Sequence, residues 1–227
     1  MRARGKRLII AIDGPAGSGK STIARRLAER LRLTYLDSGA LYRALTYMCM
    51  RDGVDLGDVP AVVKFLEALD IDLQYAAGRQ RVLANGRDIT AEIRDPAVTR
   101  QVYYVAKEPA VRKEMVAHQR AFGKRGDLVA EGRDMGTVVF PNADFKFYLD
   151  AGADVRAQRR HRELREKGME VPLEQLRKEI EQRDRTDMER KVAPLKRAED
   201  ATVVDTSDMT IDEVVEHVME RIEKGRK

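Results

Sequence analysis

The chain has 227 residues, with 43 Lys or Arg against 38 Asp or Glu, and a formal net charge of +5. Acidic and basic residues alternate instead of segregating, which argues against a tightly wrapped nucleic acid as partner and suits small anionic substrates. The single Cys49 excludes a disulfide framework and a multi-thiolate metal site, and no apolar run approaches the ~20 residues of a membrane helix. We therefore expect a cytoplasmic protein with no membrane partner.

The first elements predict a strand, a glycine-rich turn and a helix. Residues 8–12 form a continuous apolar run, which is typical of a strand buried on both faces of a parallel sheet. Apolar residues spaced four apart predict a helix over 21–32, and 35–36 read as a second short strand. Ser38 is the expected N-cap of a helix over about 40–51.

Residues 71–94 have a different texture. Residues 71–75 alternate between apolar and polar, Ala77 and Gly78 are expected to turn, and 81–83 return. Asn85-Gly86 is a strong hairpin signal. We expect a small antiparallel sheet inserted into the α/β core.

Helical periodicity recurs later in five segments, at 96–106, 109–122, 154–167, 173–183 and 211–222. Strands are expected between them at 128–130, 145–149 and 202–205. An irregular charged stretch is expected from 184 to Pro194. Strands that alternate with helices in this way predict an α/β protein with a doubly wound parallel sheet.

The glycine-rich turn carries the chemistry. It matches the phosphate-loop pattern G-x-x-x-x-G-K-[ST] in the residues Gly14, Pro15, Ala16, Gly17, Ser18, Gly19, Lys20 and Ser21. An apolar strand precedes it and an amphipathic helix follows, so that backbone N–H groups and a helix N-terminus converge on one anion site. Lys20 would reach the β- and γ-phosphates and Ser21 would ligate Mg²⁺. An ordinary glycine-rich turn is the alternative, and we infer that the chain binds a nucleoside triphosphate.

Arginines suggest what accepts the phosphoryl group. A kinase with a phosphorylated acceptor must hold two anions face to face, which requires fixed guanidinium groups between them. Candidates expected outside regular helices are Arg43, Arg133, Arg183, Arg185 and Arg190, while Arg159 and Arg160 fall on a helix. The clusters 37–43, 132–136 and 183–190 also fit a capped helix start, a tight loop with an ion pair and a self-neutralising surface segment.

Together these segments resemble the bacterial cytidylate kinases, a family of nucleoside monophosphate kinases. The resemblance runs in order over about 7–222, and it is carried by 12–22, 36–43, 131–141, 183–190 and 193–195. The Gly-Arg-Asp-Met-Gly-Thr block at 132–137 is its most distinctive part.

The resemblance implies transfer of the ATP γ-phosphoryl group to CMP or dCMP, with Mg²⁺ and without a covalent enzyme intermediate. It implies a single three-layer P-loop NTPase domain, which we expect to be a monomer. The core would comprise about 7–37, 97–158 and 191–227, a monophosphate-binding insert about 38–96, and a helical lid about 159–190.

The resemblance also assigns roles to matching positions. Residues 14–22, which add Thr22 to the motif, and the lid residue Arg160 would bind ATP. The implied CMP-binding residues are Ser38, Tyr42, Arg43, Tyr103, Arg112, Arg133, Asp134, Arg183, Asp187 and Arg190. Among these, Arg43, Arg133 and Arg190 would hold the phosphate, Arg183 and Asp187 the pentose, and Arg112 and Asp134 the cytosine. The implied catalytic residues are Lys20, Arg133, Arg159 and Arg190.

Two positions depart from the family pattern. Tyr103 stands where the family usually carries a serine near the base, and it could donate a hydrogen bond, stack on the ring or turn away. Glu131 stands where some relatives have Asp, and its longer carboxylate could still hold a Mg²⁺-bound water.

Two rival readings stay open from the residues alone. Another small P-loop kinase would share the loop but not the pairing of Arg112 with Asp134. A P-loop regulatory or nucleic-acid-binding protein is suggested by a pI of 9.3 and the basic helix around 156–165. Steeply salt-dependent binding to RNA or DNA, without ADP production, would favour that second reading.

Overall fold

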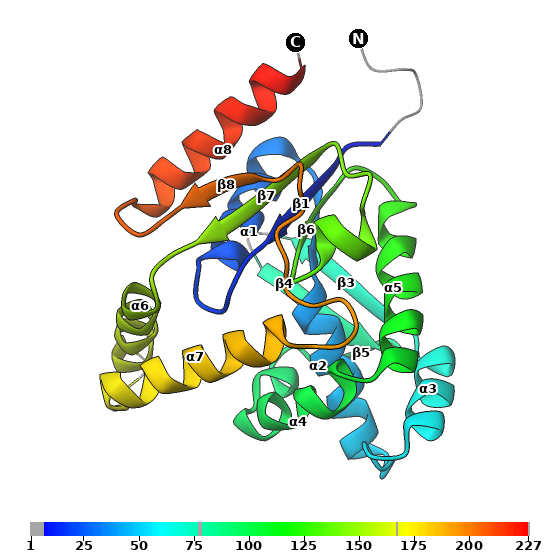
Figure 1. Cartoon of the computed structure of the whole chain (residues 1–227). Helices are drawn as coiled ribbons and strands as arrows, with labels where there is room; N and C mark the ends of the chain where they lie inside the picture. Colours follow the sequence, from blue (N-terminus) through cyan, green and yellow to red (C-terminus); the bar gives the residue numbers. More distant parts are fainter. Residues whose placement is uncertain (1–6, 77–78, 167, 227) are drawn as a thin grey trace.

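A computed structural model describes residues 7–76, 79–166 and 168–226, and a parallel sheet forms its centre (Figure 1). Five strands lie side by side in the order β2-β6-β1-β7-β8, and every neighbouring pair is parallel. Their bounds are β1 Ile9–Asp13, β2 Thr34–Asp37, β6 Leu128–Glu131, β7 Phe145–Asp150 and β8 Thr202–Asp205. The predicted doubly wound α/β fold is confirmed, since consecutive strands alternate with helices and lie on both sides of β1.

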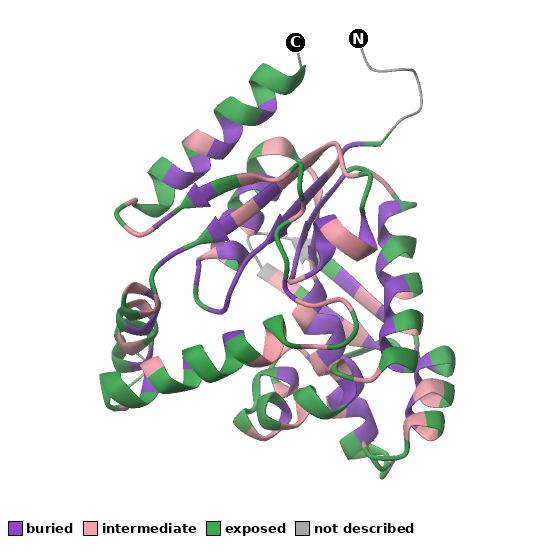
Figure 2. Ribbon diagram, viewed as in Figure 1, coloured by how far each residue is buried: buried purple, intermediate pink, exposed green. Residues whose placement is uncertain are grey.

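Helices cover the sheet on both faces and make two apolar cores (Figure 2). On one face α1 (Lys20–Leu31) and α8 (Ile211–Arg226) bury residues such as Leu27 and Val218 against Ile10 and Phe147. On the other face α2 (Ser38–Arg51) and α5 (Pro109–Gly123) pack residues such as Leu45 and Met115 against Ala130. Cys49 is buried in this second core.

The predicted antiparallel insert is present. It consists of β3 (Ile71–Ala76), β4 (Arg79–Ala84) and β5 (Arg87–Asp88), with Leu73 opposite Val82. The expected turn at Ala77 and Gly78 lies outside the described residues.

The helix α3 (Val59–Ala68) was not predicted, although Asp58 caps it by accepting a hydrogen bond from the Ala61 N–H. After the insert come the short 3₁₀ turn η1 (Glu92–Arg94) and α4 (Pro96–Ala106). The helix expected at 96–106 therefore agrees with α4.

Two predicted boundaries are wrong. Asp37, not Ser38, caps α2, because its carboxylate accepts the Ala40 N–H at 2.9 Å, and Ser38 is the first helical residue. The charged stretch expected to be irregular from 184 to Pro194 is helical as far as Met188, because α7 runs over Leu173–Met188, and it is irregular only over 189–194. Arg183 and Asp187 therefore lie one turn apart on the same helix, which fixes their relative positions.

The helix α6 (Ala153–Glu166) pairs with α7 beside the sheet (Figure 1). It agrees with the helix expected at 154–167, although Lys167 lies outside the described residues. The two helices share a small apolar core of their own, made by Ala157, Leu164, Leu176 and Ile180.

Both ends of the described chain lie at the amino edge of the sheet. The chain enters β1 there, and Gly225 near the end of α8 lies against the ring of Phe145, the first residue of β7. No helix among the described residues has the length and apolar character needed to cross a bilayer.

Candidate functional site

The phosphate-loop motif follows β1 at the carboxyl edge of the sheet and is built by its backbone. Gly14 has φ +148°, and a Cβ atom there would lie 2.0 Å from the Leu149 carbonyl oxygen of β7, so only glycine fits. Gly19 has φ +87° and precedes α1, whose N-terminus therefore opens toward the loop. A glycine-rich loop that leads into the N-terminus of a helix is an arrangement suited to binding an anion.

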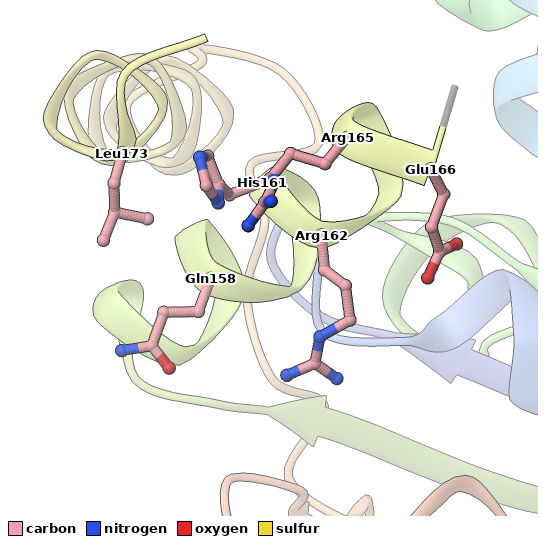
Figure 3. A pocket seen from close by; sticks show the side chains of 6 residues that line it. All are labelled: Gln158, His161, Arg162, Arg165, Glu166 and Leu173. Atoms are coloured by element: carbon pink, nitrogen blue, oxygen red, sulfur yellow. The ribbon is translucent and has the colours of Figure 1, made fainter. Parts of the chain in front are cut away.

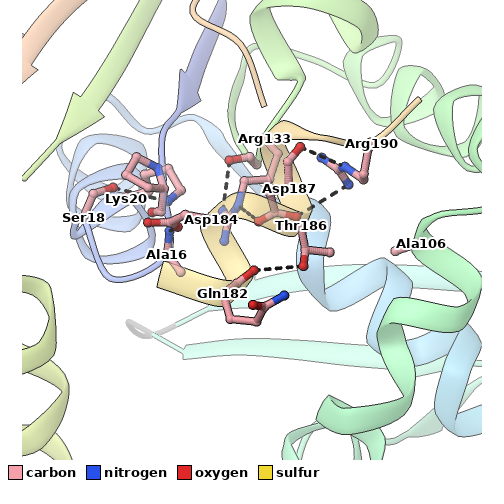
Figure 4. Close-up of polar contacts among 12 residues, drawn as sticks. Ala16, Ser18, Lys20, Ala106, Arg133, Gln182, Asp184, Thr186, Asp187 and Arg190 are labelled. Atoms are coloured by element: carbon pink, nitrogen blue, oxygen red, sulfur yellow. Dashed lines mark hydrogen bonds and ion pairs between the residues drawn. The ribbon is translucent and has the colours of Figure 1, made fainter. Parts of the chain in front are cut away.

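Lys20 is folded against this loop. Its ammonium group donates to the Pro15 carbonyl oxygen at 2.5 Å and to Ser18 Oγ at 3.3 Å (Figure 4). Burial and the nearby Arg133 cation lower the pKa of Lys20 well below its usual value. An anionic ligand beside Lys20 would offset both effects, so this position favours phosphate.

Acidic side chains end the neighbouring strands. Glu131 lies directly opposite Asp37 of β2 and Ile12 of β1 in the sheet register. Its carboxylate accepts hydrogen bonds from the Tyr35 hydroxyl at 3.0 Å and from the Ser21 hydroxyl. Burial and the Asp37 charge raise the pKa of Glu131. A hydroxyl and carboxylates at the foot of a phosphate site are the hard oxygen donors that Mg²⁺ prefers, so these residues fit the predicted metal.

Asp13 joins the phosphate loop to the distinctive Gly-Arg-Asp-Met-Gly block. This carboxylate, at the end of β1, accepts the backbone N–H groups of Met135 at 2.8 Å and Gly136 at 2.7 Å. Burial raises the pKa of Asp13 to about 6 against the opposing effect of these two bonds. The bonds hold the start of the π-helical turn η2 (Met135–Val139), directly after Arg133 and Asp134.

An arginine cluster, made by Arg43, Arg133, Arg183 and Arg190, lies near the phosphate loop, because the charges of Arg133 and Arg183 act on Lys20. Arg133 Nε donates to Asp187 Oδ2 at 2.8 Å, and Arg190 lies on the other side of the same carboxylate, with Nη1 3.8 Å from Oδ1 (Figure 4). Burial alone would raise the pKa of Asp187, but the Arg133 and Arg190 cations outweigh it and lower that pKa. Asp187 therefore stays ionised and separates two like charges.

This arginine cluster carries more positive charge than its own acids balance. Desolvation by the surrounding protein and the Arg133 cation lower the pKa of Arg183 to about 10. Arg43 completes the group and pairs with Asp37 at 3.0 Å. This excess of cations is suited to binding an anion.

A buried ion pair lies beside the arginine cluster, close to Arg190. Arg112 Nη2 lies 2.5 Å from Asp134 Oδ2, and both side chains are about 97% inaccessible. The guanidinium lies 5.6 Å from the centre of the Tyr42 ring, and burial raises the pKa of the Tyr42 hydroxyl to about 12. Among the described residues, buried polar atoms without a hydrogen-bond partner include Tyr42 Oη, Arg112 Nε and Arg190 Nη2. Buried polar atoms normally have hydrogen-bond partners, so three unpartnered atoms in this region indicate that it binds a polar ligand.

Other predicted residues lie further from this group. Tyr103 is 47% exposed, and its ring contacts Tyr104 and the Lys107 ammonium group. Arg160 is exposed and pairs with Glu163 of its own helix at 2.8 Å. Ser38 is buried and accepts a hydrogen bond from Gln119 Nε2 at 2.9 Å.

Arg159 is directed toward the segment that follows β8. Its guanidinium donates to the side-chain oxygen of Thr206 at 3.0 Å and to the Thr206 carbonyl oxygen. Thr206 Oγ1 also contacts the carbonyl oxygen of Asp150, at 3.0 Å, at the end of β7. Because Thr206 Oγ1 also lies 3.5 Å from the Ser18 carbonyl oxygen, Arg159 is placed near the phosphate loop.

Sequence reasoning missed the residues that hold the site together. Asp13, Gln119, Arg156 and Asp184 are all buried and all bind a neighbouring element. Asp184 follows Arg183 in a segment dense with charges, and nothing in the pattern separates it from a surface acid. For Asp13 a signal existed, because a carboxylate that directly precedes a phosphate loop at the end of a buried strand is itself expected to be buried.

Two hollows lie elsewhere on the surface. One, of about 490 Å³, is lined by Gln158, His161, Arg162 and Arg165 of α6 and by Leu173 at the start of α7 (Figure 3). The other, of about 440 Å³, lies between the end of α5 and the segment after η2. None of the predicted nucleotide-binding residues lines either hollow.

The parallel sheet has β1 at its centre, and the phosphate loop that follows β1 lies beside an arginine cluster. This combination defines a P-loop kinase. Comparison with known proteins specifies the kind. The family model for cytidylate kinase matches residues 10–224. A cytidylate kinase of Geobacillus kaustophilus is 50% identical over 95% of this chain and 96% of its own length, and one of Bacillus subtilis is 44% identical over 96% and 98%. The chain belongs to the cytidylate kinase family.

Solved structures agree on the fold. A protein from Thermus thermophilus superposes with a TM-score of 0.52 and 18% identity, over 96% of this chain and 97% of its own. This likeness extends to the architecture alone.

Proposed function

We propose that this protein transfers the γ-phosphoryl group of ATP to CMP or dCMP, giving ADP and CDP or dCDP. The arginine cluster beside the phosphate loop carries the proposal, since it offers cationic groups to two polyanions. Family membership supports cytosine as the base of the acceptor.

Residues 14–22 would hold the triphosphate. Lys20 already lies over the loop, bound to two of its oxygens, and would exchange those bonds for β- and γ-phosphate oxygens. Arg159 would approach from α6, where its contacts to Thr206 hold it near the loop, and Arg160 would join it on closure of a lid formed by about 159–190.

Arg43, Arg133 and Arg190 would bind the acceptor phosphate. Their charges offset the repulsion between two anions that must approach in line, which is the main barrier the protein has to lower. No general base is needed, because the acceptor phosphate is already anionic at neutral pH. Arg183 and Asp187, one turn apart on α7, would hold the pentose hydroxyls.

Arg112 and Asp134 would read the base, beside Ser38, Tyr42 and Tyr103. A carboxylate accepts the exocyclic amino group of cytosine, and a guanidinium donates to its carbonyl and ring nitrogen. Uracil places a carbonyl where the amino group was, so that two acceptors would face each other in a buried site.

Ser21 and, through water, Glu131 would hold Mg²⁺ together with the ATP phosphates. The metal supplies charge neutralisation between the β- and γ-phosphates. Among the described residues no cluster of three or more His, Cys, Asp or Glu side chains has metal-site geometry.

A coupled ADP-release assay over CMP, dCMP, UMP, AMP and shikimate tests the proposal. We expect CMP or dCMP to be turned over fastest, and only with Mg²⁺ present. Fast turnover of AMP or shikimate with CMP inert would refute the assignment of the acceptor.

A further inference from the structure

Both backbone polar groups of Ala16, a residue of the phosphate loop, are bound by side chains of the α6–α7 pair. The Ala16 N–H donates to Asp184 Oδ1 at 3.1 Å, and the Ala16 carbonyl oxygen accepts from Arg156 Nη1 at 2.9 Å. The same Nη1 lies 2.5 Å from Asp184 Oδ2. The three contacts close a ring between a loop, α6 and α7.

The ring is enclosed by protein. The side chains of Arg156 and Asp184 are 7% and 10% exposed, and Arg156 Nε also donates to the Ala151 carbonyl oxygen at 2.8 Å. A Cβ atom on Gly17 would lie 3.2 Å from Arg156 Cβ, so α6 packs closely on the loop. A buried ion pair adds little to the free energy of unfolding compared with an apolar replacement. Its fixed geometry can nevertheless set the relative positions of the elements that it joins, here the loop, α6 and α7.

The ring joins the two halves of the site. Asp184 lies beside Arg183 and three residues before Asp187, on the helix that would hold the acceptor nucleotide. Ala16 lies within the loop that would hold the donor, two residues before Ser18. We propose that Asp184 is a positioning residue, which through Arg156 sets the acceptor helix α7 at a fixed distance from the phosphate loop.

This inference rests on the proposed function, because the groups to be aligned are the phosphates of ATP and CMP. It assigns Asp184 no contact with either nucleotide. Loss of the ring should therefore misplace the two phosphates relative to each other while each nucleotide still binds.

The test is Asp184→Asn in the full-length protein. Asn keeps an acceptor for the Ala16 N–H and almost the same volume, but it removes the charge that pairs with Arg156. We expect kcat to fall about 100-fold, as for a misplacement of about 1 Å, with each KM within about threefold of the wild type. In the wild type we expect a non-hydrolysable ATP analogue to increase the affinity for CMP, because the two sites are held at a fixed distance. In Asp184→Asn this increase in affinity, measured by calorimetry, should be smaller.

Asp212→Asn is the matched control. This substitution removes the charge of an aspartate that also pairs with an arginine, Arg26, but on the exposed surface of α8. It should leave kcat unchanged. Arg156→Lys is the second variant, since Lys keeps the charge but cannot bind Ala16, Ala151 and Asp184 together. It should show the same fall in kcat.

Wild-type kcat in both ring variants, with only a lower melting temperature, would overturn the inference and leave the ring a structural role. Tighter ATP binding in Asp184→Asn would overturn it too, because Asp184 would then be occupying an ATP subsite. A wild type inactive on CMP and dCMP would instead refute the proposed function, which the same assay reports separately.

Discussion

The two halves of the site are built in different ways. The half proposed to bind ATP, the phosphoryl donor, is one contiguous loop, and its phosphate-binding groups would be chiefly backbone N–H groups fixed by glycine conformations and by the start of α1. The acceptor half is made by side chains from α2, α5, α7 and the segment after β6. A loop of this kind is fixed locally, whereas the acceptor half exists only once distant parts of the chain have packed.

The joints between the halves are buried carboxylates. Asp13 ties the end of β1 to Met135 and Gly136, and Asp184 ties α7 to Ala16. Each accepts backbone N–H groups across a boundary between elements. The acceptor half is therefore positioned by its contacts with the donor half. Loss of the Asp13 or Asp184 hydrogen bonds should displace the acceptor residues more than the phosphate loop.

The largest expected effect comes from the acceptor half. Arg133→Ala should lower kcat/KM for CMP by about 1000-fold, because a guanidinium that offsets charge in phosphoryl transfer contributes that much. Arg43→Ala and Arg190→Ala should act in the same direction. Steady-state kinetics would check this, with Arg177→Ala as control, because Arg177 is a partly exposed arginine of α7 paired with Glu174. Full activity in the Arg133, Arg43 and Arg190 variants would contradict the proposed binding of two anions by these arginines.

Asp13 should make the stability of the joint depend on pH. Its pKa is raised from 3.8 to about 6 in the folded protein, so the folded state binds the proton more tightly than the unfolded state. Its contribution to stability is therefore fully present below about pH 4 and falls by on the order of 3 kcal/mol as pH rises through about 6.

Urea unfolding of the wild type and Asp13→Asn between pH 4 and 7 measures this effect. The difference in unfolding free energy, wild type minus variant, should decrease across that range because Asn does not titrate. A difference independent of pH would show that Asp13 does not bind a proton there.

Asp134 should set the choice of base. Asp134→Asn should lower the ratio of kcat/KM for CMP to that for UMP by at least about tenfold, since the amide can donate to the uracil carbonyl. The ratio cancels any general loss of activity caused by leaving Arg112 without its charged partner. An unchanged ratio would place base selection elsewhere.

The smallest effect is expected at Tyr103. Because its ring is half exposed and contacts Tyr104 and Lys107, Tyr103→Ser should change the KM for CMP by no more than about threefold, as for other exposed positions. A much larger rise in that KM would show that Tyr103 turns toward Arg112 and Asp134 and binds the base.

The same contrast explains what the sequence could predict. Glycine spacing and an apolar strand identify the phosphate loop from neighbouring residues alone, and alternation identifies the insert. The pairing of Arg133 with Asp187 joins residues 54 positions apart, and only the resemblance to a family brought them together. The sequence does not show whether Ser38 or Asp37 caps α2, because a hydroxyl and a carboxylate are both good acceptors at a helix N-cap. Only tertiary packing, which places Gln119 against Ser38, selects between them.

The closeness of the end of α8 to the first residue of β7 has a practical consequence. Both ends of the described chain, Arg7 and Arg226, lie at the amino edge of the sheet, opposite the edge that carries the phosphate loop. A purification tag, a fused enzyme or a sensor surface attached through either end would leave the nucleotides an unobstructed approach.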